Sequence, residues 1–274
     1  MSHHRSKDAS RRYHDRVARR YDAIYDDPYW EFHDELTWRR IKPWLPKDAN
    51  AHCADLGCGT GKWGLKLLKS GFATTFVDHS AAMIEQVRAK LGTMGPRQSK
   101  GTLIVADIVE MPEAPKEAFD LVLAMGDPLS ICSDAKRAVR EMARICRAGG
   151  VVIATADNKL AAIDHYVEIG SLDALEEFVE RGKTNWLTAD ERERFELTTF
   201  TPGELRRLFE SNGFEAIELT GKTIIPVREN KRLLEDPGAV DRLLKMEMEL
   251  GKDAAAVGRC GHLQIVGRKK KDRG

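Results

Sequence analysis

The stretch CADLGCGTGKWGLKLLKSGFATTFVD, residues 53–78, decides the fold of this chain. A short apolar run reaches Asp55, glycines alternate with other residues as far as Gly61, and an amphipathic segment follows. A second apolar run then ends on Asp78. This order predicts a strand, a glycine loop, a helix and a second strand, with a carboxylate at the C-terminal end of each strand.

The glycine loop predicts a site for a nucleoside. Glycine lets the backbone turn tightly and lets a ligand approach without a Cβ in the way, and the following helix offers free N–H groups at its N-terminus. Asp78 occupies the strand tip from which an acid accepts hydrogen bonds from ribose hydroxyls in such folds. Residues 59–64 formally match the dinucleotide fingerprint. Asp55 argues against that reading, because its carboxylate would repel a pyrophosphate but suits a ligand with an ammonium and a sulfonium group.

At this point the sequence resembles the class I S-adenosylmethionine-dependent methyltransferases. Their first motif, D/E-x-G-x-G-x-G, is matched in full by residues 55–61. The resemblance covers about residues 48–156 through motifs and the rest through topology alone. It implies an enzyme that uses S-adenosyl-L-methionine and releases S-adenosyl-L-homocysteine. The cofactor-binding residues expected on this basis are Tyr21, Asp55, Gly57, Cys58, Gly59, Gly61, Asp78, His79, Asp107, Ile108 and Met125.

A third apolar run, residues 102–108, also reaches an acid. In the resembled family an acidic side chain here, or the backbone N–H beside it, holds the adenine, and Asp107 with Ile108 fits that role. The family also often carries a Tyr-Asp pair like Tyr21-Asp22 in helices that cover the cofactor. The alternatives are an aspartate that caps a turn and a tyrosine that faces the core.

The remaining sequence continues to alternate between strands and helices. It predicts an α/β fold with a doubly wound, mostly parallel seven-stranded sheet in a single domain with helical additions. Residues 1–10 are polar and are expected to be disordered. The expected parts are an N-terminal helical lid at 11–45, a core at 48–158, 199–226 and 259–269, and cap insertions at 159–198 and 228–257.

Helical covers over the ligand edge favour an enclosed small molecule as the methyl acceptor. Closing a site excludes water and fixes the geometry of the reactants. The sequence thus predicts transfer of a methyl group to O, N or S of a small molecule. Methylation of a protein or RNA and a catalytically inactive, cofactor-binding regulatory protein are the alternatives, and an oxidoreductase is the least favoured.

Methyl transfer needs a base only if the acceptor arrives protonated. Asp127 is the first candidate, because it opens the loop after the fourth expected strand. His165 and Tyr166 follow, and Asp157, Asn158 and His33 are further candidates. For each histidine a surface or structural role is favoured over that of a base. The D/N-P-P-Y/F motif of DNA-methylating enzymes is broken after Pro128, since Leu129 and Ser130 replace its second proline and its aromatic residue. That loss of a stacking partner argues against methylation of a nucleic-acid base.

The composition of the chain bears on its expected partners, metal content and cellular compartment. The net charge of +1 does not indicate a nucleic-acid partner. The 5 cysteines lack C-x-x-C spacing, which favours reduced thiols in the cytoplasm and no zinc site. Cys260 and His262 by themselves offer too few ligands to bind a metal. No apolar run suits a membrane span or a secretory signal. The expected state is a monomer or homodimer whose partner is a small-molecule acceptor, with no metal and no membrane.

Overall fold

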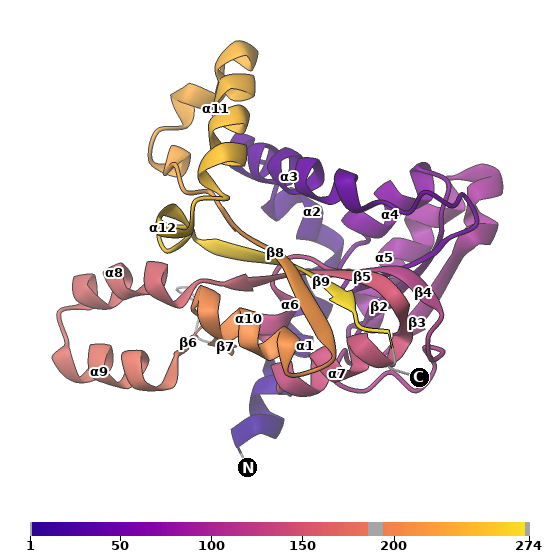
Figure 1. Ribbon diagram of the computed structural model, residues 1–274, viewed down its shortest axis with the longest axis horizontal. Helices are drawn as coiled ribbons and strands as arrows, with labels where there is room; N and C mark the ends of the chain where they lie inside the picture. The colour runs from indigo at the N-terminus through magenta and orange to yellow at the C-terminus, as the bar shows by residue number, and fades with distance from the viewer. Residues whose placement is uncertain (1, 186–193, 272–274) are drawn as a thin grey trace.

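The computed structural model describes residues 2–185 and 194–271, with side chains from residue 9 onward. Its centre is a seven-stranded sheet in the order β3-β2-β1-β4-β5-β9-β8 (Figure 1). The strands β3, β2, β1, β4 and β5 pair in parallel, and β9 runs antiparallel between β5 and β8. The predicted mostly parallel α/β sheet is therefore confirmed. The strands are β1 (His52–Leu56), β2 (Ala73–Asp78), β3 (Gly101–Val105), β4 (Phe119–Ala124), β5 (Cys146–Asp157), β8 (Phe214–Lys222) and β9 (His262–Lys269).

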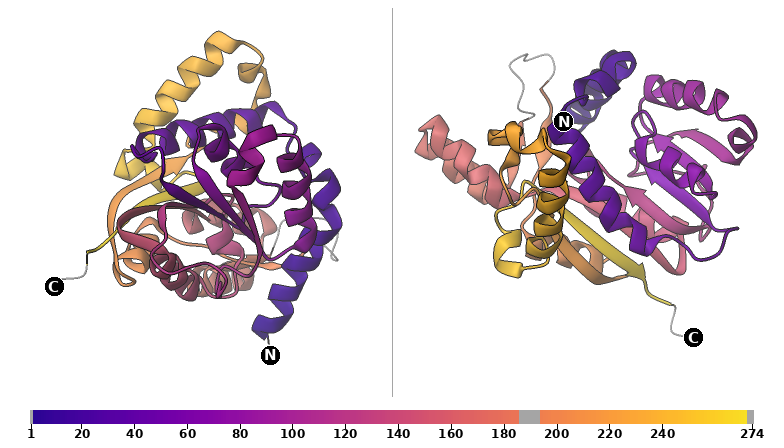
Figure 2. Two further views of the ribbon diagram at one scale, coloured as in Figure 1. Left: turned by 90° about the vertical axis from the view of Figure 1, so that its right-hand side faces the viewer. Right: turned by 90° about the horizontal axis from the view of Figure 1, so that it is seen from above.

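Helices cover both faces of this sheet (Figure 2). On one face α3 (Pro28–Ile41) and α4 (Lys62–Lys69) bury Ile41 and Leu67 against Cys53 of β1, and α5 (Ala81–Gly92) buries Val87 against Phe76 of β2. On the other face α7 (Ala135–Ile145) and α10 (Pro202–Glu210) pack Met142 and Phe209 against the sheet. Successive strand residues point to opposite faces, and this alternation decides which side chains reach the site.

The N-terminal segment forms α1 (Ser2–Val17), the 3-10 turn η1 (Ala18–Arg20) and α2 (Tyr21–Ile24) before α3, and the 3-10 turn η2 (Lys42–Trp44) follows α3. The prediction of disorder is wrong for residues 2–10, since the helix already begins at Ser2, and Met1 lies outside the described residues. Ser10 and Tyr13 are buried, so packing holds α1 in place at these residues. The backbone N-terminal to Ser10 is also helical, because the residue types there tolerate a helix.

The two cap insertions differ in structure. In the first, α8 (Lys159–Ile169) and α9 (Leu172–Arg181) form a hairpin that projects from the sheet in Figure 1. A two-stranded sheet of β6 (Lys183–Asn185) and β7 (Glu196–Thr198) follows, where only helix was expected. Residues 186–193, including Trp186, lie outside the described part. The second insertion contains η5 (Val227–Glu229), η6 (Lys231–Leu234), α11 (Pro237–Leu250) and α12 (Ala254–Val257), and α11 packs against α3.

Local signals in the sequence place several helix ends. Ser80 caps α5 by accepting a hydrogen bond from the backbone N–H of Met83, and Thr201 with Glu204 forms a capping box at the start of α10. The third strand ends at Val105, before the end of the apolar run at 102–108, and a 3-10 segment η3 (Gly95–Lys100) precedes it. Helix α7 ends at Ile145, so β5 begins before the glycine pair at 149–150. A short helix, α6 (Pro128–Ile131), follows β4.

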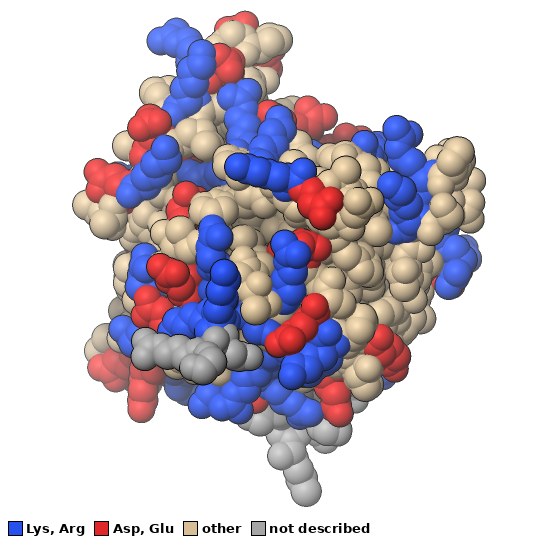
Figure 3. Space-filling view, turned by 45° about the vertical axis from the view of Figure 1, so that its right-hand side comes forward, with Lys and Arg blue, Asp and Glu red and all other residues tan. Residues whose placement is uncertain are grey.

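The surface carries both signs of charge. On the face seen in Figure 3, Lys and Arg side chains are interspersed with Asp and Glu, in keeping with a net charge of +1. Among the described residues, no helix is long and apolar enough to cross a membrane.

Candidate active site

A cavity of about 220 Å³ opens at the C-terminal ends of the parallel strands, beneath the N-terminal helices. Its wall combines the glycine loop, the tips of the strands and side chains of α1, α2 and α3. Two groups of residues make up most of the lining. One surrounds Asp78 at the tip of β2, and the other surrounds Asp127 after β4.

Asp78 fixes the glycine loop and still faces the cavity. Its Oδ2 accepts a hydrogen bond from the backbone N–H of Gly59 at 2.9 Å, and its Oδ1 accepts one from that of Ser80 at 2.8 Å. Gly57 and Gly59 adopt φ angles of +61° and +53°, a left-handed conformation that favours glycine. The loop therefore follows a path that brings bare backbone and a carboxylate to one side of the cavity.

Asp55, which was expected from the sequence to bind the cofactor, does not line the cavity. Its side chain is fully buried, and its Oδ2 accepts a hydrogen bond from the backbone N–H of Gly64 at 2.7 Å. Asp55 shares the face of β1 with Cys53, which α4 covers. Burial raises the pKa of Asp55 to about 7. The structure thus gives Asp55 a role in holding the first turn of α4 beneath the loop.

Most of the other residues expected to bind the cofactor do reach the cavity. Gly61 is an exception, because it packs on Val87 and Phe76 behind the loop. The expected residues that line the cavity are Tyr21, Gly57, Cys58, Gly59, Asp78, His79, Asp107, Ile108 and Met125. Their role in binding stays a prediction, which their shared location supports.

The N-terminal cover is tied to the core by polar contacts. Asp22 accepts a hydrogen bond from the Thr60 hydroxyl at 2.5 Å and forms an ion pair with Lys90 at 2.7 Å. The hydroxyl of Ser80 donates to Asp15 of α1 at 2.6 Å. These contacts clamp α1 and α2 over the glycine loop and hold Tyr21 against the cavity.

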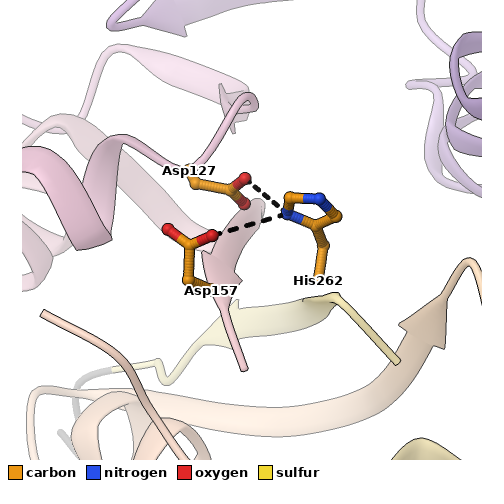
Figure 4. Close-up of side chains that lie close together, drawn as sticks. All are labelled: Asp127, Asp157 and His262. Atoms are coloured by element: carbon orange, nitrogen blue, oxygen red, sulfur yellow. Dashed lines mark hydrogen bonds and ion pairs between the residues drawn. The ribbon is translucent and has the colours of Figure 1, made fainter. Parts of the chain in front are cut away.

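The second group contains Asp127, Asp157 and His262 (Figure 4). His262 Nδ1 lies 2.7 Å from Asp127 Oδ2 and 3.8 Å from Asp157 Oδ1. Asp157 at the end of β5 is the register partner of His262 at the start of β9. The backbone N–H of Asp127 donates to the Thr155 hydroxyl at 2.9 Å. Three strand ends therefore bring these side chains to one point.

Burial and the charges of Asp127, Asp157 and His262 shift one another's pKa values. Burial alone would raise the pKa of Asp127, but the charge and hydrogen bond of His262 hold it well below its usual range. Burial and the charge of Asp127 raise the pKa of Asp157 to about 7. Burial acts to lower the pKa of His262, and the two carboxylates outweigh it and raise that pKa above 6.5.

Two further buried side chains, Lys222 and His33, close the cavity on this side. Lys222 ends β8 and is the register partner of His262. Its Nζ lies 3.3 Å from the hydroxyl of Thr37 on α3. Burial lowers the pKa of Lys222 to about 8. Burial and the charge of Lys222 lower the pKa of His33 to about 3, so this imidazole is neutral.

His165 and Tyr166 lie outside the cavity, and the structure gives no support to a catalytic role for them. They belong to the projecting helix α8, where Tyr166 stacks on Phe178 and donates to the Thr184 hydroxyl at 2.9 Å. Asn158 is also removed from the site, because its amide donates to the backbone of Gly258 and Cys260. Of the two insertions, the first contributes Phe195 to the lining, and no described residue of 228–257 lines it.

The sequence reading missed Lys222 and the role of His262. Both stand at ends of strands, like Asp127, but a strand-end lysine or histidine is not a motif. Only the pairing of β9 with β5 and β8 brings them beside Asp157 and Asp127. His262 was weighed only as half of a metal pair with Cys260, and the structure instead joins it to carboxylates.

Comparisons with known proteins agree with this arrangement. A family model described as a methyltransferase domain matches residues 53–150. A phosphatidylethanolamine N-methyltransferase from Cereibacter sphaeroides is 32% identical over 205 residues, which cover 70% of this chain and 94% of that protein. A SAM-dependent methyltransferase structure from Methanosarcina mazei has a TM-score of 0.61 at 18% identity, covering 85% of this chain and 98% of that one. A possible histamine N-methyltransferase from Thermotoga maritima has a TM-score of 0.58 at 17% identity, covering 95% and 100%. At these identities the two structures establish the fold alone.

The site and these comparisons define the class of protein. The chain belongs to the class I S-adenosylmethionine-dependent methyltransferases, and S-adenosyl-L-methionine is its cofactor. The residues present fit that cofactor. Asp78 offers a carboxylate suited to ribose hydroxyls, and the aromatic face of Tyr21 suits a positively charged sulfonium. Asp107 and Ile108 lie on the same wall, where the adenine is expected.

Proposed function

We propose that this enzyme methylates a small molecule at O, N or S. The observation that supports this most is the second half of the cavity. Beyond the residues expected to bind the cofactor, the wall continues through Trp30, His33, Asp157, Lys222 and His262. The N-terminal helices cover this space, so it suits a compact acceptor better than a polymer. The name of the Cereibacter relative supports nitrogen among the three acceptor atoms.

In this proposal His262 receives the proton that a hydroxyl or ammonium acceptor must lose. The bound cofactor supplies an electrophilic methyl group. The Nδ1–H of His262 donates to Asp127 Oδ2 at 2.7 Å, which leaves Nε2 as the atom that accepts the proton. Asp127 orients the ring and stabilises its charged form, the pattern of a carboxylate–histidine pair in proton transfer. Asp157 adds a second acid beside the same ring.

Enclosure also contributes to the reaction. Methyl displacement from a sulfonium is an in-line reaction, so holding the acceptor in line with the methyl group accounts for much of the rate enhancement. The contacts of Asp22 with Thr60 and Lys90 keep the cover closed on the loop. Exclusion of water strengthens every charge interaction inside the cavity.

The test is to incubate the protein with cofactor labelled on its methyl group and a metabolite extract. We expect the label in a product of low molecular mass. The variant Tyr166→Phe, which changes a residue of α8 outside the cavity, should label the same product at the same rate. Label found in protein or RNA would support the polymer alternative instead. Binding of S-adenosylhomocysteine without any transfer would support an inactive regulatory protein.

A further inference from the structure

We propose that Lys222 and His33 form a binding subsite for an anionic group, a carboxylate or a phosphate, on the methyl acceptor. This inference rests on the proposed function, because it assigns the chemical class of the acceptor. It stands on two buried side chains that line the cavity: Lys222 forms no ion pair among the described residues, and His33 Nε2 has no hydrogen-bond partner there.

Lys222 is a buried cation without a matching anion. Its side chain is only 2% exposed and lines the cavity. Among the described residues its ammonium has one hydrogen bond, to the Thr37 hydroxyl at 3.3 Å, and no ion pair. That hydroxyl already donates to the backbone oxygen of His33 at 2.8 Å. With one hydrogen bond made, two of the three ammonium protons remain available to a ligand. Burying a charge costs much free energy unless it is paired, so a bound anion would stabilise this ammonium.

His33 is the second orphaned donor. It is 8% exposed and lines the cavity, and its Nε2 has no hydrogen-bond partner among the described residues. Its Nδ1 lies 3.6 Å from Asp34 Oδ1, beyond a good hydrogen bond. Burial and, to a lesser extent, the charge of Lys222 lower the pKa of His33 to about 3, so the ring is neutral. A neutral imidazole in this place can donate one N–H to an anion that the ammonium also binds.

The charges around the subsite leave it positive. Asp127 is paired with His262, and Asp34 forms an ion pair with Lys62. Burial and Asp127 raise the pKa of Asp157 to about 7, which reduces its negative charge near neutral pH. Asp127 and Asp34 act on Lys222 through space, but among the described residues neither forms an ion pair with its ammonium. An anionic group on the acceptor would supply the missing ion-pair partner.

The position of the subsite suits an acceptor that is held at one end and methylated at the other. Lys222, His262 and Asp157 are register partners across β8, β9 and β5, and paired residues project from the same face of a sheet. His33 lies across from them, with its ring centroid 5.5 Å from that of His262. An anion bound by Lys222 and His33 would therefore present the rest of the acceptor to His262.

Affinity for the anion should depend on pH in a defined direction. Lys222 has a pKa of about 8 because burial lowers it. Anion binding needs the protonated ammonium, so affinity should fall as pH rises through about 8. The charged groups that face Lys222 and set this value are Asp127, Arg40, Asp34, Cys260, His33 and His262.

The direct test uses protein loaded with S-adenosylhomocysteine and needs no knowledge of the acceptor. We would titrate it with inorganic phosphate and, separately, with acetate, and follow the backbone amide signals of residues 33–37 and 222 by NMR. We expect a saturable shift, and the anion that saturates distinguishes phosphate from carboxylate. Lys222→Met should weaken that binding roughly 10- to 100-fold, the range for loss of a charge-assisted hydrogen bond.

Controls separate this result from general effects. Lys222→Arg keeps the charge and should retain most of the affinity, and Lys245→Met removes an exposed lysine of α11 and should change nothing. Unaltered affinity for S-adenosylhomocysteine shows that each variant is folded. No saturable shift in the wild type, or the same shift in Lys222→Met, would overturn the proposal.

A second measurement links the subsite to turnover. The labelled product from the metabolite extract should carry an acidic group and be retained on an anion exchanger. A labelled product without an acidic group would overturn the inference while the proposed function stands. If no labelled product forms at all, the proposed function fails, and the anion titration still decides whether the subsite exists.

Discussion

His262 Nδ1 lies 2.7 Å from Asp127 Oδ2, although 135 positions separate the two residues in the sequence. The antiparallel pairing of β9 with β5 creates this contact, because it brings the start of β9 to the C-terminal ends of the parallel strands. The pair lies in the wall of the cavity beyond the residues expected to bind the cofactor. Its chemistry leads to the first prediction.

Asp127→Asn should shift the pH dependence of methyl transfer to lower pH. The Asp127 carboxylate helps to raise the pKa of His262 above its ordinary value. A base works only when it is deprotonated, so the wild-type rate should climb as pH rises through that raised pKa. Asparagine keeps a hydrogen-bond acceptor but removes the charge. The pKa of His262 then falls, and its basicity falls with it. Initial rates with labelled cofactor across pH measure the shift, and an unchanged profile would contradict the role of Asp127.

His262→Gln tests the same pair through the rate. Loss of a general base typically lowers the rate about 10²- to 10⁴-fold, while affinity for S-adenosylhomocysteine should stay the same. His165→Gln is the matched control, because His165 lies on α8 outside the cavity. Equal activity of both variants would remove His262 from the reaction.

Asp78→Ala should weaken binding of S-adenosylhomocysteine by about 1–3 kcal/mol, the scale of a lost partner for buried polar groups. The variant removes the carboxylate from the cavity wall and also the acceptor for the N–H groups of Gly59 and Ser80. Titration calorimetry measures the change. Unaltered affinity would exclude Asp78 from the cofactor site.

Asp55→Asn should flatten the pH dependence of folding stability. Burial raises the pKa of Asp55 to about 7 from an ordinary value of 3.8. Between these values the folded chain keeps a proton that the unfolded chain releases, so this group makes the free energy of unfolding fall as pH rises from about 4 to 7. The effect amounts to at most about 4 kcal/mol.

In Asp55→Asn the side chain stays neutral and can still accept the hydrogen bond of Gly64. The free energy of unfolding of this variant should therefore lack the decline between about pH 4 and 7 that Asp55 causes. Denaturant unfolding at pH values across that window gives both curves without cofactor. Parallel curves for wild type and variant would show that Asp55 is ionised in the folded protein. Asp157 titrates in the same window in both proteins, so the difference between the curves isolates Asp55.

Gly64→Ala should destabilise the fold by about 1–3 kcal/mol, the usual cost of overpacking. A Cβ at Gly64 would lie 2.2 Å from the ring of Phe76, whereas one at Gly92 would meet nothing within 4 Å. Gly92→Ala, near the end of α5, is therefore the control and should be neutral or slightly stabilising. Thermal unfolding compares the two, and equal melting temperatures would contradict the close packing of α4 on β2.

Much of the fold could be predicted because its signals are local. Apolar runs, glycines and caps such as Ser80 and Thr201 act within a few residues of themselves. The direction in which a side chain at the end of a strand points is harder to predict from the sequence. Asp55 and Asp78 both follow apolar runs, yet Asp78 faces the cavity and Asp55 lies beneath α4. The helix expected from residue 11 in fact begins at Ser2, and its first turns were missed because their polar residues carry no strong pattern.

The sequence by itself determined the glycine loop and the alternation of strands and helices, because these depend on short-range backbone preferences and on apolar periodicity. The class of cofactor came from the motif at residues 55–61, through its resemblance to a known family. The tertiary structure decided what surrounds the acceptor. Lys222, His262 and Asp157 come together only through the register of β8, β9 and β5. Hydrogen bonding between distant strands sets that register, and no short segment of the chain encodes it.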